Sequence, residues 1–186
     1  MTELVVSSWV MISLSLMVSE RFLGNRSLRE VSRAGRTSDQ LMVLLTIPAH
    51  IGPVLLGLLL GSPPSPWLAG VGTFLGCLGV VIRARAMVDL RGRYLLSPAQ
   101  QPDQEFLVVS GAYATVRHPG YLGIACTFTG LGVLAGGWLG PLWILPMLAG
   151  IRHRIGLEEK LLTEEFQNKY ATYARAVPWR FLPHVY

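Results

Sequence analysis

Long apolar blocks alternate with polar segments along the chain. The blocks run roughly from Leu4 to Phe22, from Leu41 to Leu60, from Trp67 to Ile82 and from Tyr121 to Ile151. A helix needs about 20 apolar residues to cross the hydrocarbon core of a bilayer. The last block is too long for one such helix and contains the turn-forming run 136–141, so we interpret it as two spans joined by a tight turn. The pattern therefore predicts five membrane spans.

Composition supports this interpretation. Of the 186 residues, 51% are hydrophobic and only 15% are charged, and the mean hydropathy is +0.44. This composition is too apolar for a soluble domain of this length. We expect an all-α fold, a polytopic transmembrane helical bundle of about five spans that forms a single membrane domain and is followed by a cytosolic amphipathic helix.

Positive charges gather on one side of the five-span arrangement. All 16 Lys and Arg residues lie in the segments 21–36, 83–117 and 152–186. On the opposite side of the membrane, residues 1–3, the loop 62–66 and the turn at Gly136 contain none. This distribution follows the positive-inside rule and places the N-terminus outside and the C-terminus in the cytosol. A four-span arrangement would break it. The net charge of +5 therefore indicates membrane topology and attraction to anionic lipid headgroups, not nucleic-acid binding.

Beyond the last span, apolar residues recur at spacings typical of one helical face. They are Ile151, Ile155, Leu162, Phe166, Tyr170 and Tyr173. This predicts one long amphipathic helix that leaves the membrane and ends near Arg175. Glu158 falls on the same stripe, where a carboxylate needs a partner, and Arg154 lies one turn earlier. An ordinary salt bridge at the membrane exit is the alternative interpretation of this pair.

Two dense polar clusters flank the last apolar block. The run 117–123 precedes it, and Arg152, His153 and Arg154 with the pair 158–159 follow it. Ionisable groups concentrated at one membrane face indicate chemistry on a partly lipid-soluble substrate. A positive-inside anchor is the simpler alternative.

The histidines offer no metal site. His50 lies within the second block near Pro48 and Pro53, where an imidazole is a functional candidate, although a packed histidine at a proline kink is the simpler interpretation. The other histidines are dispersed and lack the spacing of a helical ligand pair, so we expect no bound metal.

The C-terminal part combines several motifs. They are Leu107-Val108-x-x-Gly111-x-Tyr113-x-x-x-Arg117-His118-Pro119-x-Tyr121-x-Gly123, Arg154-x-x-x-Glu158-Glu159-x-x-Leu162, Tyr170-x-x-Tyr173, and Val177-Pro178 to Pro183. Over about residues 105–186 this combination resembles the isoprenylcysteine carboxyl methyltransferase family of integral membrane enzymes. Residues 1–104 match that family in hydropathy alone and are expected to form three spans and a connector, through which a lipid tail would enter laterally.

The resemblance implies S-adenosyl-L-methionine as cofactor, bound at the cytosolic face between the His-Pro loop, the last two spans and the C-terminal helix. It implies cofactor-binding roles for Leu107, Val108, Gly111, Tyr113, Arg117, His118, Pro119, Tyr121 and Glu159. Arg117 and His118 would hold the carboxylate of the cofactor. Tyr113 and Tyr121 would pack against its adenine or sulfonium, unless they serve only as membrane-interface anchors.

The resemblance also implies that Arg154 and Glu158 lie at the reacting centre. Methyl transfer to a carboxylate is an in-line displacement that depends on alignment and exclusion of water, and it needs no metal. The planar guanidinium of Arg154 suits a substrate carboxylate, and Glu158 would orient that arginine.

The methyl acceptor stays open. A carboxylate such as that of an isoprenylcysteine is the first expectation, and another lipophilic acid, a phenol or a thiol would also suit a short chain. Expected partners are this lipophilic or lipidated substrate and membrane lipids. Two isolated cysteines and the lack of a cleavable signal fit a prokaryotic plasma membrane.

Three other classes of protein are compatible with parts of the pattern. The ending 177–186 also resembles the tail of membrane sterol reductases, which use NADPH, although Pro119 and the pair 158–159 favour the methyltransferases. The others are a phospholipid N-methyltransferase and a non-enzymatic membrane scaffold whose basic loops bind anionic lipid.

Overall fold

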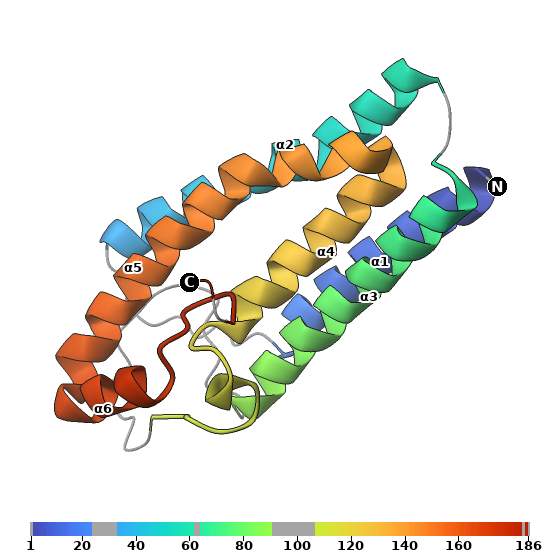
Figure 1. The fold of residues 1–186 in the computed structure, drawn as a ribbon. Coiled ribbons are helices and arrows are strands. Elements are labelled where there is room, and N and C mark those ends of the chain that lie inside the picture. Colours follow the sequence, from blue (N-terminus) through green and yellow to red (C-terminus); the bar gives the residue numbers. More distant parts are fainter. Residues whose placement is uncertain (1, 24–32, 62–63, 91–106, 184, 186) are drawn as a thin grey trace.

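A computed structural model describes residues 2–23, 33–61, 64–90, 107–183 and 185. Helices without any strand make up the regular structure of these residues (Figure 1). In chain order they are α1 (Thr2–Leu23), α2 (Arg33–Leu60), α3 (Pro66–Asp89), the 3₁₀ helix η1 (Gly111–Ala114), α4 (Pro119–Gly136), the 3₁₀ helix η2 (Gly137–Ile144), α5 (Leu145–Phe166) and α6 (Asn168–Ala176). The predicted all-α class is confirmed.

Four helical stretches among the described residues are long and apolar enough to cross a membrane. They are Glu3–Leu23, Arg36–Leu60, Pro66–Asp89 and Pro119–Phe166. The fourth contains α4, η2 and α5, and it reverses direction after α4, where Gly137 has a φ of 60° (Figure 1). The expected tight turn is therefore present, and α4 and α5 form the two arms of a hairpin. The protein is a multi-pass integral membrane protein, and its described residues form a bundle of five long helices, α1 to α5.

Helices α3 and α4 pack backbone against backbone. A Cβ atom on Gly130 would overlap the backbone nitrogen of Gly76, and one on Gly72 would lie 2.9 Å from the carbonyl oxygen of Gly130. Small residues let membrane helices approach closely and gain van der Waals contact. Gly72 and Gly76 therefore allow α3 and α4 to pack closely, which holds the start of α4 against α3.

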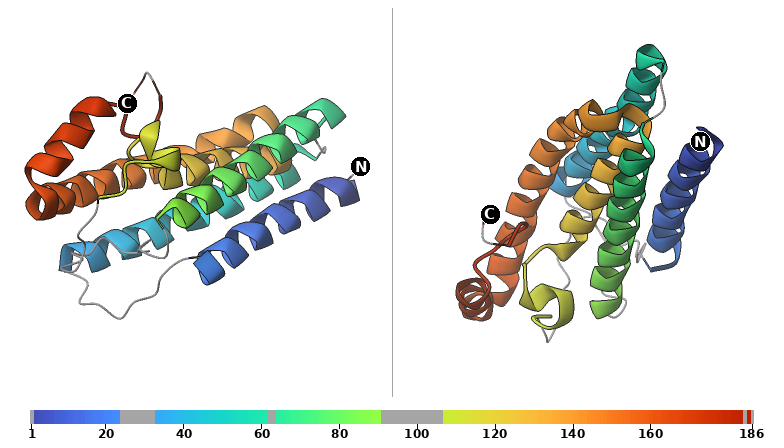
Figure 2. Two further views of the ribbon diagram at one scale, coloured as in Figure 1. Left: turned by 90° about the horizontal axis from the view of Figure 1, so that it is seen from below. Right: turned by 45° about the vertical axis from the view of Figure 1, so that its right-hand side comes forward.

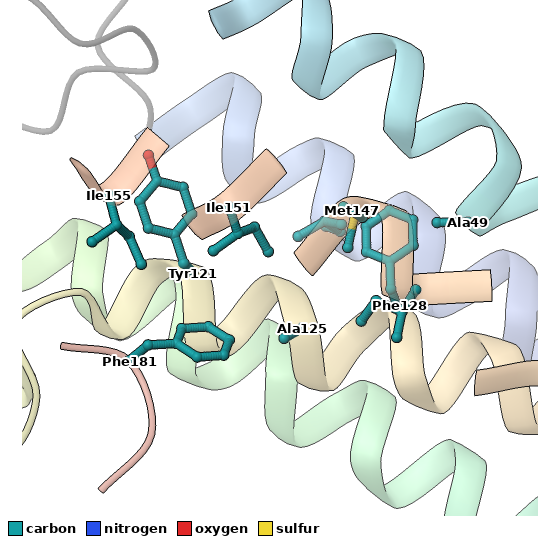
Figure 3. Packing of buried hydrophobic residues seen from close by; sticks show 10 residues of the cluster. Ala49, Tyr121, Ala125, Phe128, Met147, Ile151, Ile155 and Phe181 are labelled. Atoms are coloured by element: carbon teal, nitrogen blue, oxygen red, sulfur yellow. The ribbon is translucent and has the colours of Figure 1, made fainter. Parts of the chain in front are cut away.

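A buried apolar cluster fills the space between the arms of the hairpin and its neighbours. It consists of Leu16, Ala49, Tyr121, Ala125, Phe128, Ile144, Met147, Ile151, Ile155 and Phe181. Figure 3 shows Tyr121 of α4 beside Ile151 and Ile155 of α5, with Phe181 of the C-terminal tail near the same end. The cluster therefore extends along the hairpin to the hydroxyl group of Tyr121.

The C-terminal helix is broken where one continuous helix was predicted. α5 ends at Phe166, and Gln167 has a φ of 45°, in the left-handed region. The chain turns there, and α6 folds back toward the bundle (Figure 2). Tyr170 and Tyr173 then pack with Phe166 in a second buried cluster. Helical spacing continues across the break because both helices bury a face, so periodicity did not reveal the turn.

Candidate functional site

The loop before α4 is attached to the end of α3. The carboxylate of Asp89 accepts a hydrogen bond of 2.8 Å from the backbone N–H of Ala112 in η1. Gly111 precedes it with a φ of 64°, and a Cβ atom there would overlap the Asp89 carboxylate. Glycine at this position therefore permits both the turn and the close contact.

The same loop is paired with the C-terminal tail. The backbone N–H groups of Arg117 and His118 donate to the carbonyl oxygens of Trp179 and Arg180, at 2.9 and 2.8 Å. His118 is the N-cap residue of α4 and Pro119 occupies the first turn, where a missing N–H is not needed. These constraints hold the His118 side chain inside the protein, at 6% exposure.

Tyr121 connects the predicted pair Arg154 and Glu158. Nε of Arg154 donates to the Tyr121 hydroxyl at 2.7 Å, and that hydroxyl donates to Oε1 of Glu158. Nε of Arg154 and Oε1 of Glu158 are 3.7 Å apart, within ion-pair range but longer than a hydrogen bond. The two predicted residues are therefore neighbours, and a phenol lies between their charges.

Arg154 has a further partner that sequence reasoning missed. Its Nη1 lies 2.7 Å from Oδ1 of Asp39, near the start of α2. The Arg154 side chain is 6% exposed and the Asp39 side chain 32%. The available signal was an acidic residue just before an apolar block, which is a costly place for an unpaired carboxylate.

A second group of charges surrounds Glu159. Its Oε1 accepts from Nε of Arg117 at 3.0 Å and lies 2.9 Å from Nη2 of the same residue. Its Oε2 is 2.8 Å from Nε of Arg180, which sequence reasoning did not assign to the site. His118 joins the two groups, because its Nδ1 is 3.3 Å from Glu158 and its Nε2 is 3.5 Å from Glu159.

The carboxylates favour a charged imidazole. Burial alone would lower the pKa of His118, but the adjacent Glu158 and Glu159 raise it above its ordinary value of 6.5. In the neighbouring cluster, burial raises the pKa of Tyr170 and of Tyr173. Both phenols therefore stay neutral across the physiological pH range.

The other predicted cofactor-binding residues form an adjacent layer with α6. Leu107 packs against the cluster of Phe166, Tyr170 and Tyr173, and the carbonyl oxygen of Tyr113 accepts from the Tyr173 hydroxyl at 2.7 Å. Val108 is half-buried. Arg117 links this layer to the charged network, since its Nη1 donates to backbone oxygens of Ala174 and Val177 at 3.1 and 3.3 Å.

His50 lies apart from the charged network. Its Nε2 is 3.4 Å from the Ser13 hydroxyl, and its ring meets Trp9 and Phe128 edge-on, with centroids 5.3 and 4.7 Å away. It is packed within the bundle, as the simpler interpretation predicts. Among the described residues no group of three or more His, Cys, Asp or Glu side chains is arranged to hold a metal ion.

Known proteins match the part of the chain that carries most of this network. The model of the isoprenylcysteine carboxyl methyltransferase family matches residues 72–164, half of the chain. A protein-S-isoprenylcysteine O-methyltransferase of Schizosaccharomyces pombe is 33% identical over 104 residues, which cover 55% of this chain and 44% of that relative. The chain thus matches less than half the length of the relative. On the strength of the family match, the chain belongs to the isoprenylcysteine carboxyl methyltransferase family.

Proposed function

We propose that this protein is an S-adenosyl-L-methionine-dependent methyltransferase that acts at the cytosolic membrane face on a lipophilic acceptor, first of all the carboxylate of an isoprenylcysteine. Membership of the family supports the reaction class, and the name of the fission-yeast relative supports the acceptor. The observation that carries the proposal is the buried guanidinium of Arg154, held by Asp39 and Tyr121 at the end of an apolar core.

The charges around Glu159 fit the amino-acid end of the cofactor. His118 Nε2 is buried and lies 3.5 Å from Glu159 without forming a well-aligned hydrogen bond, so it can donate to a cofactor carboxylate. Arg117 adds a second positive group close by. Glu159 offers a carboxylate that suits the cofactor's ammonium group. When bound, the cofactor supplies a methyl group made electrophilic by its sulfonium.

Arg154 suits the acceptor. The buried cluster of α4 and α5 ends at Tyr121, beside the guanidinium, so apolar surface and a cation meet at one point. An acceptor with an apolar tail and an anionic head would match this arrangement, with its tail on the apolar surface and its head on the guanidinium. Arg154 would hold the acceptor carboxylate in line with the methyl group, and such alignment contributes much of the rate in reactions between two bound partners. The acceptor is already ionised, so Glu158 need not remove a proton.

The orientation in the membrane is part of the proposal. The described arginines of the site lie just before α4 (Arg117), near the middle of α5 (Arg154) and in the C-terminal tail (Arg180). The positive-inside rule places this end in the cytosol and the N-terminus outside. An alkaline phosphatase reporter fused after Gly137 should be active and one fused after Arg175 inactive in a bacterial inner membrane. The opposite result would move the site to the outer face.

Calorimetric titration of the detergent-purified protein tests the cofactor. S-adenosylhomocysteine, the methyl-transfer product, should bind with micromolar affinity, and NADPH should not bind. Glu159→Gln should weaken this binding about tenfold, because a lost charge-assisted hydrogen bond costs roughly 1.5 kcal/mol or more. Glu164→Gln is the matched control, since Glu164 is exposed on the same helix. Binding of NADPH alone would favour a reductase, and binding of neither compound would favour a scaffold.

The acceptor requires a separate assay. Release of S-adenosylhomocysteine should be measured with lipophilic carboxylic acids, including a farnesylated cysteine derivative, and with lipophilic phenols and thiols. Turnover restricted to phenols or thiols would keep the methyltransferase and reject the carboxylate acceptor.

A further inference from the structure

We infer that Asp39 is a positioning residue for Arg154, contributed by a helix outside the family-matched region. This inference rests on the proposed function. Asp39 lies in α2, whereas the family match covers residues 72–164. Its Oδ1 is 2.7 Å from Nη1 of Arg154, across 115 positions of sequence. The reacting centre is therefore completed by a carboxylate from the N-terminal half of the bundle.

The packing of α2 on α5 places Asp39 opposite Arg154. A Cβ atom on Gly150 would lie 2.6 Å from Cδ1 of Leu45 and 3.3 Å from Sδ of Met42. Gly150 is one turn before Arg154, and Met42 is about one turn after Asp39 in a helix that runs the other way (Figure 1). The close approach at Gly150 thus aligns the two charged residues.

Two hydrogen bonds from different helices fix the plane of the guanidinium. Tyr121 of α4 accepts from Nε, and Asp39 of α2 accepts from Nη1 of Arg154, each at 2.7 Å. One hydrogen bond would leave the planar group free to pivot about that contact, whereas two at separate nitrogens define its orientation. A fixed plane is what bidentate recognition of an acceptor carboxylate requires.

The charges near Arg154 indicate what happens without Asp39. Glu158 lies 3.7 Å from Nε, so it offers the guanidinium an alternative carboxylate partner. Removal of Asp39 would let Arg154 turn toward Glu158 and away from the acceptor. At the cofactor end, Glu159 pairs with Arg117, whereas Asp39 pairs with Arg154. The defect should therefore appear in turnover and not in cofactor binding.

Three variants separate positioning from general destabilisation. Asp39→Ala should lower kcat about 10- to 100-fold, since small misplacements of a positioning group cost up to about 10²-fold, with an unchanged Kd for S-adenosylhomocysteine. Asp39→Asn should recover part of the loss, because its amide oxygen still accepts from Nη1. Gln40→Ala is the matched control on the exposed neighbour and should behave as the parent.

A measurement without turnover tests the contact itself. Thermal unfolding of Asp39→Ala, Arg154→Ala and the double variant should be non-additive, with the double variant close to Arg154→Ala alone. Additive losses, or an Asp39→Ala variant with the parent's kcat, would overturn the inference. So would a rise in kcat/KM, which would mean that Asp39 competes with the acceptor. Absence of S-adenosylhomocysteine binding by the parent protein is a different failure, because it removes the proposed function itself.

Discussion

The hydroxyl of Tyr121 lies 2.7 Å from Nε of Arg154 and at the same time donates to Glu158. One phenol on α4 thereby organises two charged residues on α5. The tyrosine was expected to pack against the cofactor, and that role stays a prediction. Its observed contacts make it a structural centre of the charged network.

Tyr121→Phe should impair both activity and stability. The substitution keeps the ring in the apolar cluster but leaves the Nε–H of Arg154 without this acceptor, which costs about 1–3 kcal/mol for a buried donor. We expect kcat to fall at least about tenfold, the rate equivalent of 1.4 kcal/mol. Tyr173→Phe is the contrast, because it also loses one hydrogen bond, to the Tyr113 carbonyl, away from Arg154. A comparable fall in kcat for both variants would contradict a specific role of Tyr121.

Arg154→Lys should lose most activity although it keeps the charge. A single ammonium group on a flexible stem cannot reproduce the separate Nε and Nη1 contacts with Tyr121 and Asp39. We expect turnover to drop about 100-fold, as for other misplaced positioning groups. The control is Arg152→Lys, since Arg152 is exposed on the same helix. Near-normal turnover of Arg154→Lys, measured as release of S-adenosylhomocysteine, would show that charge alone suffices.

Stability should fall as the pH rises above about 6.5. The folded-state pKa of His118 is raised above its ordinary value of 6.5 by Glu158 and Glu159, so the protonated form is favoured by folding. This contribution is fully present below the unfolded pKa and is lost as the pH rises through the higher folded pKa. Melting temperatures measured at increasing pH, starting below the ordinary histidine pKa of 6.5, should show the decline.

His118→Gln should flatten that part of the pH profile, because it removes the titrating group. His153→Gln should keep the slope of the parent, since His153 is exposed on α5. If both variants retain the same slope, another group is responsible for the pH dependence.

The contact of α3 with α4 should be sensitive to a single methyl group. Gly130→Ala would place a Cβ atom against the backbone nitrogen of Gly76, so the helices must move apart, at a cost of about 1–3 kcal/mol. Gly70→Ala is the control, because a Cβ atom there has no neighbour within 4 Å and alanine favours helix. A thermal shift assay in detergent should show a lower Tm for Gly130→Ala only. Equal Tm values would argue against the close packing of these helices.

Hydropathy and charge determined the number of long helices, the hairpin at the end of the chain and the face that carries the positive residues. These properties depend on composition within one segment, because a bilayer selects apolar length directly. The motif around His118 and the pair Glu158 and Glu159 could likewise indicate the family from sequence, because the residues of each motif lie close together along the chain.

Tertiary structure alone decided which residues complete the site. Asp39 meets Arg154 because Gly150 lets α2 approach α5, and Arg180 meets Glu159 because the tail pairs with the loop before α4. The turn at Gln167, which brings α6 back to that loop, also could not be predicted, because the helical spacing of apolar residues continues across it. Such contacts depend on the register between distant segments. No pattern within a single segment encodes that register, because it follows from how the helices pack.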